Sequence, residues 1–217
     1  KTDMAVMQFD IVKNYTPTES QLLAEVGDAD VVVFVGGISP NLEGEEMKVS
    51  EPGFKGGDRT DIELPQAQRK VMEMLHRAGK RVVFVNCSGS AIAMVPETEN
   101  AESILQAWYP GERGGEAVSK VLFGEVNPSG KLPVTFYKSV NDLPDFLDYT
   151  MKNRTYRYFK GEALFPFGHG LSYISYEYGK PALKKVKSEE RKVKNSSAYS
   201  LSFSLSNKGN REGTEVA

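Results

Sequence analysis

The sequence has few of the residues that form disulfides or histidine metal sites. Among its 217 residues there is one cysteine, Cys87, and there are two histidines, His76 and His169. A single cysteine excludes an internal disulfide, and because it follows an apolar run we expect Cys87 to be a buried structural thiol. The two histidines fall in different sequence contexts, which disfavours a histidine-based metal centre. We therefore expect no metal and no other cofactor.

Strong net charge and long apolar runs are missing as well. The 27 basic residues nearly balance the 29 acidic ones, which leaves a formal net charge of −2. This balance creates no field that favours nucleic acid or an acidic membrane surface. No apolar run approaches the roughly 20 residues that a bilayer-spanning helix needs. The sequence therefore predicts neither a nucleic-acid partner nor membrane insertion.

Short apolar runs alternate with helical patterns in the first half of the chain. The runs Val31–Val35 and Arg81–Asn86 are typical of buried parallel strands. Between them, residues 65–78 carry an amphipathic stripe that predicts a helix ending at Gly79, and its apolar face is expected to comprise Ala67, Val71, Met74, Leu75 and Ala78. A strand, a helix and a second such strand predict a right-handed parallel unit. We expect an α/β fold of the flavodoxin-like kind, an open and mostly parallel sheet with helices on both faces.

Other segments are expected to extend this pattern. They are a strand at Met4–Phe9, a helix starting near Thr16–Glu19, a weakly helical segment at Ser88–Met94, a strand at Ser103–Trp108 and a helix at Glu116–Phe123. A glycine-rich loop, Tyr109–Gly115, lies between the last two. Such a loop can bind an anion at a helix start, although this one matches neither a dinucleotide fingerprint nor a phosphate loop.

A long loop after Val31–Val35 carries the residues of greatest chemical interest. It contains three neighbouring carboxylates, Glu43, Glu45 and Glu46, and it closes on Gly56–Arg59. Loops of this length inside a compact domain are uncommon and are usually functional or disordered. In open α/β sheets, ligands bind just beyond the carboxyl ends of the strands. The carboxylates are therefore either the chemical groups of a site or an ordinary solvated acidic loop.

The second half of the chain has a different pattern. Residues 141–178 are rich in proline, glycine and aromatic residues, which indicates a wrapping segment or a domain connector. Lys184–Lys194 is a charged run, and Tyr199–Leu205 alternates strictly, which predicts a half-buried antiparallel strand. We expect an α/β domain over residues 1–178 and part of an immunoglobulin-like β-sandwich over residues 179–217. Both ends read as if the chain were a piece of a longer polypeptide.

Six ordered motifs carry a resemblance to a known family. They are Leu42-Glu-Gly-Glu-Glu-Met47, Gly56-Gly-Asp-Arg59, Ala107-Trp-Tyr-Pro-Gly-Glu-Arg-Gly-Gly115, Asn127-Pro-Ser-Gly-Lys-Leu-Pro133, Asn153-Arg-Thr-Tyr-Arg-Tyr158 and Phe165-Pro-Phe-Gly-His-Gly-Leu-Ser-Tyr173. In this order they resemble the C-terminal α/β domain of glycoside hydrolase family 3, followed by the start of its fibronectin type III-like domain. The resemblance covers nearly the whole chain and is nearest to the β-xylosidases and β-glucosidases of polysaccharide-degrading bacteria.

The resemblance implies half of a two-carboxylate active centre. Such enzymes remove a terminal β-linked sugar from a glycoside or oligosaccharide with retention of configuration. The family's nucleophilic aspartate lies on an N-terminal barrel domain that this sequence does not contain. The general acid/base carboxylate would come from this chain, with Glu43 first and Glu45 and Glu46 as alternatives. Glu46 and Arg59 are also candidates for substrate contact, although a structural ion pair would explain Arg59 equally well.

The resemblance also implies a periplasmic or secreted location in a bacterium, and it implies that this chain hydrolyses nothing by itself. Two other interpretations remain. The chain could be a stand-alone flavodoxin-like domain that binds an anion or nucleotide at Gly111–Gly115. It could also be a non-catalytic interdomain scaffold whose glutamates are incidental. A barrel encoded upstream of Lys1 in the same gene would eliminate the first of these.

Overall fold

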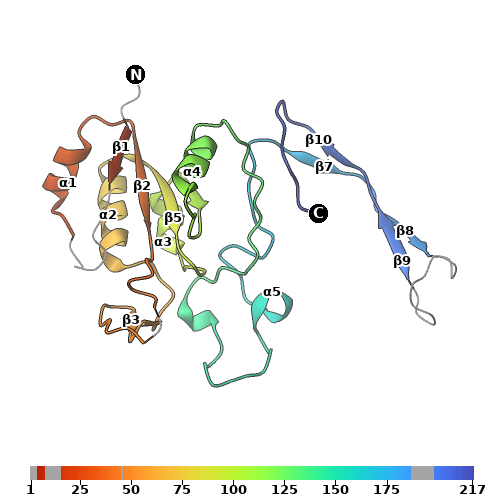
Figure 1. Cartoon of the computed structure of the whole chain (residues 1–217), viewed down its shortest axis with the longest axis horizontal. Helices are drawn as coiled ribbons and strands as arrows, with labels where there is room; N and C mark the ends of the chain where they lie inside the picture. Colours follow the sequence, from red (N-terminus) through yellow and green to blue (C-terminus); the bar gives the residue numbers. More distant parts are fainter. Residues whose placement is uncertain (1–3, 8–15, 45, 187–197) are drawn as a thin grey trace. The chain divides into compact units, whose positions relative to one another are not determined.

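The computed structural model of the chain describes residues 4–7, 16–44, 46–186 and 198–217 (Figure 1). The chain divides into two compact units. The first unit comprises residues 1–119 and 132–169, and the second comprises residues 120–131 and 170–217. The domain boundary expected after residue 178 falls inside the second unit.

A four-stranded parallel sheet forms the centre of the first unit. In spatial order its strands are β1 (Met4–Met7), β2 (Val31–Gly37), β5 (Arg81–Cys87) and β6 (Ser103–Gln106). All three neighbouring pairs are parallel, and β2 pairs with β5 along their whole length. The expected α/β class with a parallel sheet is therefore confirmed.

The two central strands are held by the apolar side chains that made them recognisable in the sequence. Phe34 of β2 and Phe84 of β5 are fully buried, and their ring centroids lie 5.7 Å apart. Val32 and Val82 on the same strands are 0% and 1% exposed. Burying each such side chain contributes on the order of 1.5–3 kcal/mol. This burial on the central strands fixes the sheet.

The described helices are α1 (Glu19–Val26), α2 (Gln66–Arg77), α3 (Val95–Asn100), α4 (Gly114–Leu122) and the short α5 (Thr155–Tyr158). The sequence predicts α1, α2 and α4, whereas α3 and α5 were not expected. Helix α1 starts at a reciprocal cap, in which Gln21 N donates to Thr18 Oγ1 and Thr18 N donates to Gln21 Oε1. It ends at Gly27. Helix α2 packs against α1, α3 and β5.

Two of the expected details are wrong. The buried face of α2 is centred on Gln68, Val71, Met72 and Leu75, so that the stripe is rotated relative to the expected one and Ala78 is exposed. Gln68 is buried because its amide closes two hydrogen bonds with the backbone of Gly37. The segment 88–94 is not helical, since helix α3 begins only at Val95, where a proline follows in its first turn. Residues 88–94 instead form an irregular loop after β5.

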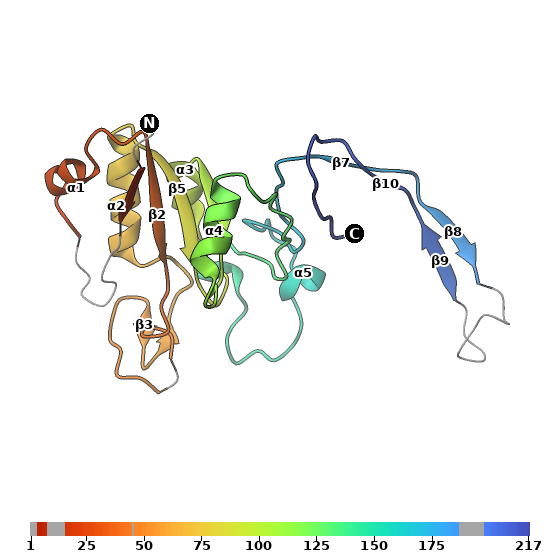
Figure 2. The same ribbon diagram turned by 45° about the horizontal axis from the view of Figure 1, so that its top comes forward.

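The acidic loop after β2 is ordered by its own small hairpin and two anchors. Its strands are β3 (Phe54–Lys55) and β4 (Asp58–Arg59), which pair antiparallel. Leu42 and Phe54 lie in the hydrophobic core with 2% and 6% of their surface exposed. Figures 1 and 2 both show this loop beyond the carboxyl end of β2. The loop is therefore part of the folded unit.

Residues 132–169, which include most of the expected wrapping segment, also belong to the first unit. Phe136 is fully buried and meets Trp108 and Phe165 edge to face at 6.1 and 6.3 Å between ring centroids. His169 stacks on Phe165 at 5.0 Å. The segment includes a 3-10 turn, η2 (Val140–Asp142). These ring contacts tie the segment to the α/β core.

The second unit contains two antiparallel pairs of strands. Strand β7 (Tyr176–Tyr178) pairs with β10 (Leu205–Asn207), and β8 (Ala182–Lys185) pairs with β9 (Tyr199–Ser202). The strand expected over Tyr199–Leu205 is thus split between β9 and β10. The expectation that it is half-buried is wrong, because Leu201 is 60% exposed. Most of the charged run lies outside the described residues. Among the helices that are described, none has the length and apolarity that crossing a bilayer requires.

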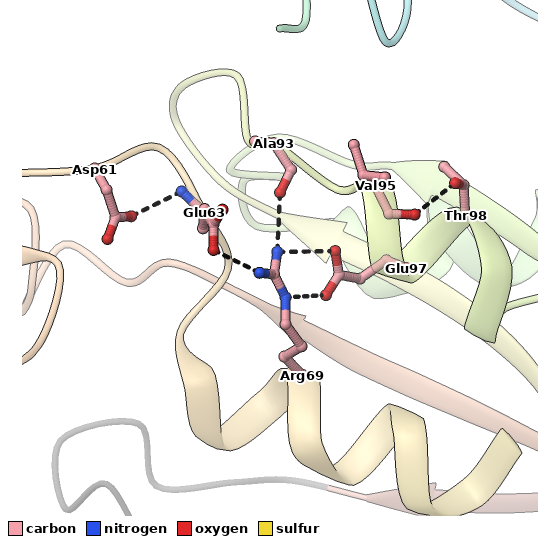
Figure 3. A network of polar contacts seen from close by, with 7 residues as sticks. All are labelled: Asp61, Glu63, Arg69, Ala93, Val95, Glu97 and Thr98. Atoms are coloured by element: carbon pink, nitrogen blue, oxygen red, sulfur yellow. Dashed lines mark hydrogen bonds and ion pairs between the residues drawn. The ribbon is translucent and has the colours of Figure 1, made fainter. Parts of the chain in front are cut away.

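A buried ion pair joins α2 to α3 (Figure 3). Arg69 Nε donates to Glu97 Oε1 at 2.8 Å, Arg69 Nη2 donates to the Ala93 carbonyl at 3.2 Å, and Arg69 Nη1 donates to Glu63 Oε2 at 2.6 Å. The Glu97 side chain is 0% exposed and that of Glu63 is 45% exposed. Burial by itself would lower the pKa of Arg69, but the hydrogen bonds and charges of Glu97 and Glu63 outweigh it and raise the pKa. Arg69 therefore stays charged and holds the end of the 88–94 loop.

We predict that Glu97→Gln lowers the free energy of unfolding of the first unit by about 3 kcal/mol, because it leaves a buried guanidinium without its main counter-charge. The matched control is Glu63→Gln, which removes the exposed partner of the same arginine and should cost less than about 1 kcal/mol. Urea denaturation followed by the fluorescence of Trp108, the single tryptophan, measures both changes. Equal losses in the two variants would contradict the assignment of Glu97 as the main partner.

Candidate functional site

Three loops meet at the carboxyl edge of the parallel sheet. The acidic loop leaves β2 after Gly37, the 88–94 loop leaves β5 after Cys87, and a third loop leaves β6 and leads to α4. The first two loops begin side by side, since Gly37 and Cys87 are register partners and Ile38 N donates to the Cys87 carbonyl at 2.9 Å. Parallel topology thus brings segments that are distant in sequence to one place.

Glu43 is the member of the carboxylate cluster that is built into this place. A backbone turn positions it, in which Leu42 N and Glu43 N both donate to the Ser39 carbonyl. Leu42 is buried in the core, and Glu43 itself is half-buried. Glu43 Oε1 accepts a hydrogen bond of 2.9 Å from the Ser90 hydroxyl on the neighbouring loop. A residue 47 positions away therefore fixes this carboxylate.

Arg59 lies on the other side of the same serine. Arg59 Nη1 donates to Ser90 Oγ at 2.9 Å and to the Ala91 carbonyl at 3.2 Å, and Nε donates to the Asp61 carbonyl at 3.1 Å. Burial lowers the pKa of Arg59, while the nearby charge of Glu43 and that of Asp61 act in the opposite direction. These hydrogen bonds of Arg59 attach the end of the acidic loop to the 88–94 loop.

Tyr109 completes the cluster from the third loop. Burial raises the pKa of its phenol, and the charge of Glu43 and a hydrogen bond with Glu43 raise it further. The ring lies directly on Gly89, where a Cβ atom would come within 2.6 Å of Tyr109 Cε2. A residue with a side chain at position 89 would therefore displace the phenol from Glu43.

A layer of polar side chains supports the 88–94 loop from below. Asn86 and Ser88 are fully buried. Asn86 Nδ2 donates to Gln106 Oε1 at 2.6 Å and to Ser88 Oγ at 3.2 Å, and Ser88 Oγ donates to the Ser90 carbonyl at 2.9 Å. Buried networks of this kind fix backbone geometry because an unpaired buried polar group is costly. This one fixes the backbone that presents Ser90.

The other residues of the expected site are placed differently. Glu46 is exposed, has a backbone φ of 50°, and has no recorded polar partner among the described residues. Glu45 lies outside the described residues. The hydrogen bonds of Arg59 go to the Ser90 hydroxyl and to the carbonyls of Asp61 and Ala91. No three side chains of the metal-binding types gather into a site within the described parts of the chain. Of the predicted residues that the structure describes, Glu43 and Arg59 are brought together, and Ser90 lies between them.

A family model agrees with this arrangement of elements. Residues 4–173 match the model described as the glycosyl hydrolase family 3 C-terminal domain. The chain belongs to this family. The match ends inside the second unit and includes the three loops around Glu43.

Relatives of this family 3 domain are named for the hydrolysis of β-linked sugars. A xylan 1,4-β-xylosidase of Xylanibacter ruminicola is 49% identical over 216 residues, which is 100% of this chain and 24% of that protein. A periplasmic β-glucosidase of Salmonella typhimurium is 34% identical over 87% of this chain and 24% of its own length. The chain therefore spans about a quarter of the length of these relatives.

Solved structures show the same fold. A β-glucosidase from Erythrobacter marinus superposes with a TM-score of 0.70 and 36% identity, over 90% of this chain and 25% of that structure. A family 3 exo-β-xylosidase in complex with a xylobiose aziridine probe superposes with a TM-score of 0.66 and 24% identity, over 79% of this chain and 22% of its own. The second likeness concerns the fold alone.

Sequence reasoning missed two residues of the candidate site, Ser90 and Tyr109. Each lies a few residues after a strand of the parallel sheet, and that position was the available signal, because strand ends of a parallel sheet share an edge. Ser90 was hidden by the mistaken expectation of a helix. Tyr109 was missed because its glycine-rich loop was considered only as a possible anion-binding loop.

We predict that Glu43→Gln lowers the pKa of Tyr109, because the variant removes a negative charge that opposes formation of the phenolate. The pKa is measured on this chain by ultraviolet titration of phenolate absorbance, as the difference between each protein and its Tyr109→Phe partner. The control is Glu46→Gln, which removes an equal charge from an exposed position and should leave the pKa of Tyr109 unchanged. Equal shifts in both variants would show that Glu43 is not the specific neighbour of Tyr109.

Proposed function

We propose that this chain supplies half of the active centre of a retaining, exo-acting β-glycosidase that removes terminal xylose or glucose. Family membership and the names of the relatives support the reaction class. The observation that carries the proposal is Glu43, a half-buried carboxylate that two other loops hold at the carboxyl edge of the sheet. A chain that spans about a quarter of its relatives' length leaves room for the other half.

The chemistry needs two carboxylates on opposite sides of the scissile bond. In a retaining enzyme one carboxylate attacks the anomeric carbon, while the other protonates the leaving oxygen and later takes a proton from water. We assign the second role to Glu43, with Glu46 and Glu45 as alternatives. The first role belongs to an aspartate on an N-terminal barrel of the same polypeptide. The two groups lie roughly 5–5.5 Å apart in such enzymes, so the barrel has to cover the Glu43 loop.

Arg59 is the remaining residue of the proposed site. The hydrogen bonds of its Nε and Nη1 atoms go to Ser90 and to backbone carbonyls, which supports a structural role. Its buried Nη2 atom has no hydrogen-bond partner among the described residues, so the same side chain can also contact a sugar hydroxyl. Glu46 is exposed on the same loop and is available for contact with a sugar hydroxyl. The residues that distinguish xylose from glucose belong mainly to the barrel in this proposal.

The second unit fits a fibronectin type III-like role. Leu183 and Leu201 face each other across β8 and β9, and they are 66% and 60% exposed. Two-stranded ribbons with an uncovered apolar pair are marginal in water, which supports further strands of the same polypeptide as their cover. We also propose a periplasmic or secreted location and a role in polysaccharide degradation. The names of the Salmonella and Xylanibacter relatives support these two proposals.

The assignment of the acid/base predicts one catalytic loss among three substitutions. In the longer polypeptide with its barrel, Glu43→Ala should reduce turnover of an aryl β-xyloside by about 100-fold or more, because it removes general acid–base catalysis. Added azide should restore turnover by replacing the activated water. Glu45→Ala and Glu46→Ala test the two alternative acid/base residues in the same assay. Near-normal turnover in all three variants would remove the acid/base from this loop and favour the scaffold interpretation.

The split between two domains predicts an inactive chain. Purified on its own, this chain should release no aryl alcohol from aryl β-xylosides or β-glucosides above the uncatalysed rate, because it lacks the nucleophile. The measurement is continuous absorbance at high protein concentration, with the longer polypeptide as the positive control. Hydrolysis by the chain alone that disappears in Glu43→Ala would show that the nucleophile also lies within it.

A further inference from the structure

The Ser90 hydroxyl occupies the space between the two charged members of the candidate site. Ser90 Oγ accepts a hydrogen bond from Arg59 Nη1 at 2.9 Å and donates one to Glu43 Oε1 at 2.9 Å. Three segments far apart in sequence therefore meet at one oxygen atom. Ser90 is absent from the expected site residues, and the family motifs around Leu42–Met47 and Gly56–Arg59 do not include it.

The chemistry of a hydroxyl makes this arrangement directional. A serine side chain carries one proton and two acceptor lone pairs. The guanidinium of Arg59 has only donors, so Ser90 Oγ must accept from it and is left to direct its single proton at Glu43. A hydrogen bond that a charged donor polarises strengthens the next one in the chain. The two consecutive hydrogen bonds, from Arg59 to Ser90 and from Ser90 to Glu43, therefore set both the position and the orientation of the Glu43 carboxylate.

The surroundings leave Ser90 little freedom to do anything else. Its carbonyl accepts the Ser88 hydroxyl at 2.9 Å, and the carbonyl of the next residue, Ala91, accepts Arg59 Nη1 at 3.2 Å. Arg69 Nη2 holds the Ala93 carbonyl from α2 at 3.2 Å. The backbone on both sides of Ser90 is thus fixed. A precisely held second residue is what a proton-transfer group needs, since catalytic geometry tolerates errors of only about 0.5 Å.

We propose that Ser90 is a positioning residue that orients the Glu43 carboxylate for proton transfer to the glycosidic oxygen. This inference rests on the proposed function, because it gives Ser90 a purpose only if Glu43 is the acid/base. Ser90 itself forms and breaks no covalent bond. Its hydroxyl restricts the carboxylate to one rotamer, while Tyr109 contacts the same carboxylate from the third loop.

The test compares Ser90→Ala, Ser90→Thr and Glu43→Ala in the longer polypeptide that includes this chain. We expect Ser90→Ala to lower kcat on aryl β-xylosides by about 10- to 100-fold, the equivalent of one hydrogen bond to a charged group. KM should change less than about twofold because no sugar contact is lost. Ser90→Thr retains the hydroxyl and should recover kcat to within about threefold of the parent. Ser119→Ala is the control, since its half-buried hydroxyl donates only to the Glu116 carbonyl on α4.

The pH profile separates positioning from general damage. The alkaline limb of kcat/KM follows loss of the acid's proton, and a hydroxyl that donates to the carboxylate favours the ionised form. Ser90→Ala should therefore move that limb to higher pH, while the other charged or titratable groups in the cluster stay in place, namely Arg59 and Tyr109 beside Glu43 and Asp61 beside Arg59. Ser119→Ala should leave the limb unmoved.

The outcomes distinguish this inference from the proposed function. If Ser90→Ala retains the parent kcat and pH profile while Glu43→Ala is inactive, the positioning role is overturned and the proposed function stands. A loss in Ser90→Ala that is matched by a lower Tm, with an unmoved pH limb and no recovery in Ser90→Thr, also overturns it. Near-normal turnover by Glu43→Ala overturns the acid/base assignment and the positioning role together.

Discussion

The whole site depends on the parallel pairing of β2 with β5 up to the last residue of each strand. At that point Gly37 lies against Cys87 so closely that a Cβ atom on residue 37 would fall 1.9 Å from the Cys87 carbonyl oxygen. The backbone φ at Gly37 is +131°, which side-chain-bearing residues rarely adopt. Glycine at position 37 lets the two segments that follow β2 and β5 leave the sheet side by side. The acidic loop and the 88–94 loop meet because of this pairing.

Buried polar side chains then fix the positions of these two loops. The Gln68 amide on α2 forms hydrogen bonds with both the N–H and the carbonyl of Gly37. Arg69 on the same helix donates to the fully buried carboxylate of Glu97. Burying such groups costs free energy that only complete pairing offsets, which makes alternative arrangements unfavourable. Helix α2 therefore serves both loops at once. It holds the start of one and the end of the other.

The proposed division of the active centre between two domains is consistent with this architecture. The α/β unit can fix a carboxylate without a substrate, because the support for Glu43 comes from Ser90, and Arg59 in turn supports Ser90. In the proposed enzyme the barrel brings the nucleophile and the sugar pocket. Each half would then be folded but chemically incomplete, and the reaction would require both. Water would be excluded from the carboxylates only where the two surfaces meet.

The sequence by itself determined the elements of the fold and the loop that carries the candidate acid. Two apolar strands, the helix between them, the start of a helix near Thr16–Glu19 and the position of Glu43 after β2 were all readable from local patterns, because burial and capping act over a few residues. The rotated face of α2 was not readable, since the burial of Gln68 depends on the distant backbone of Gly37. The tertiary structure alone decided that Ser90, Arg59 and Tyr109 surround Glu43. These contacts join segments separated by tens of residues, and no local propensity encodes which strand ends become neighbours in a sheet.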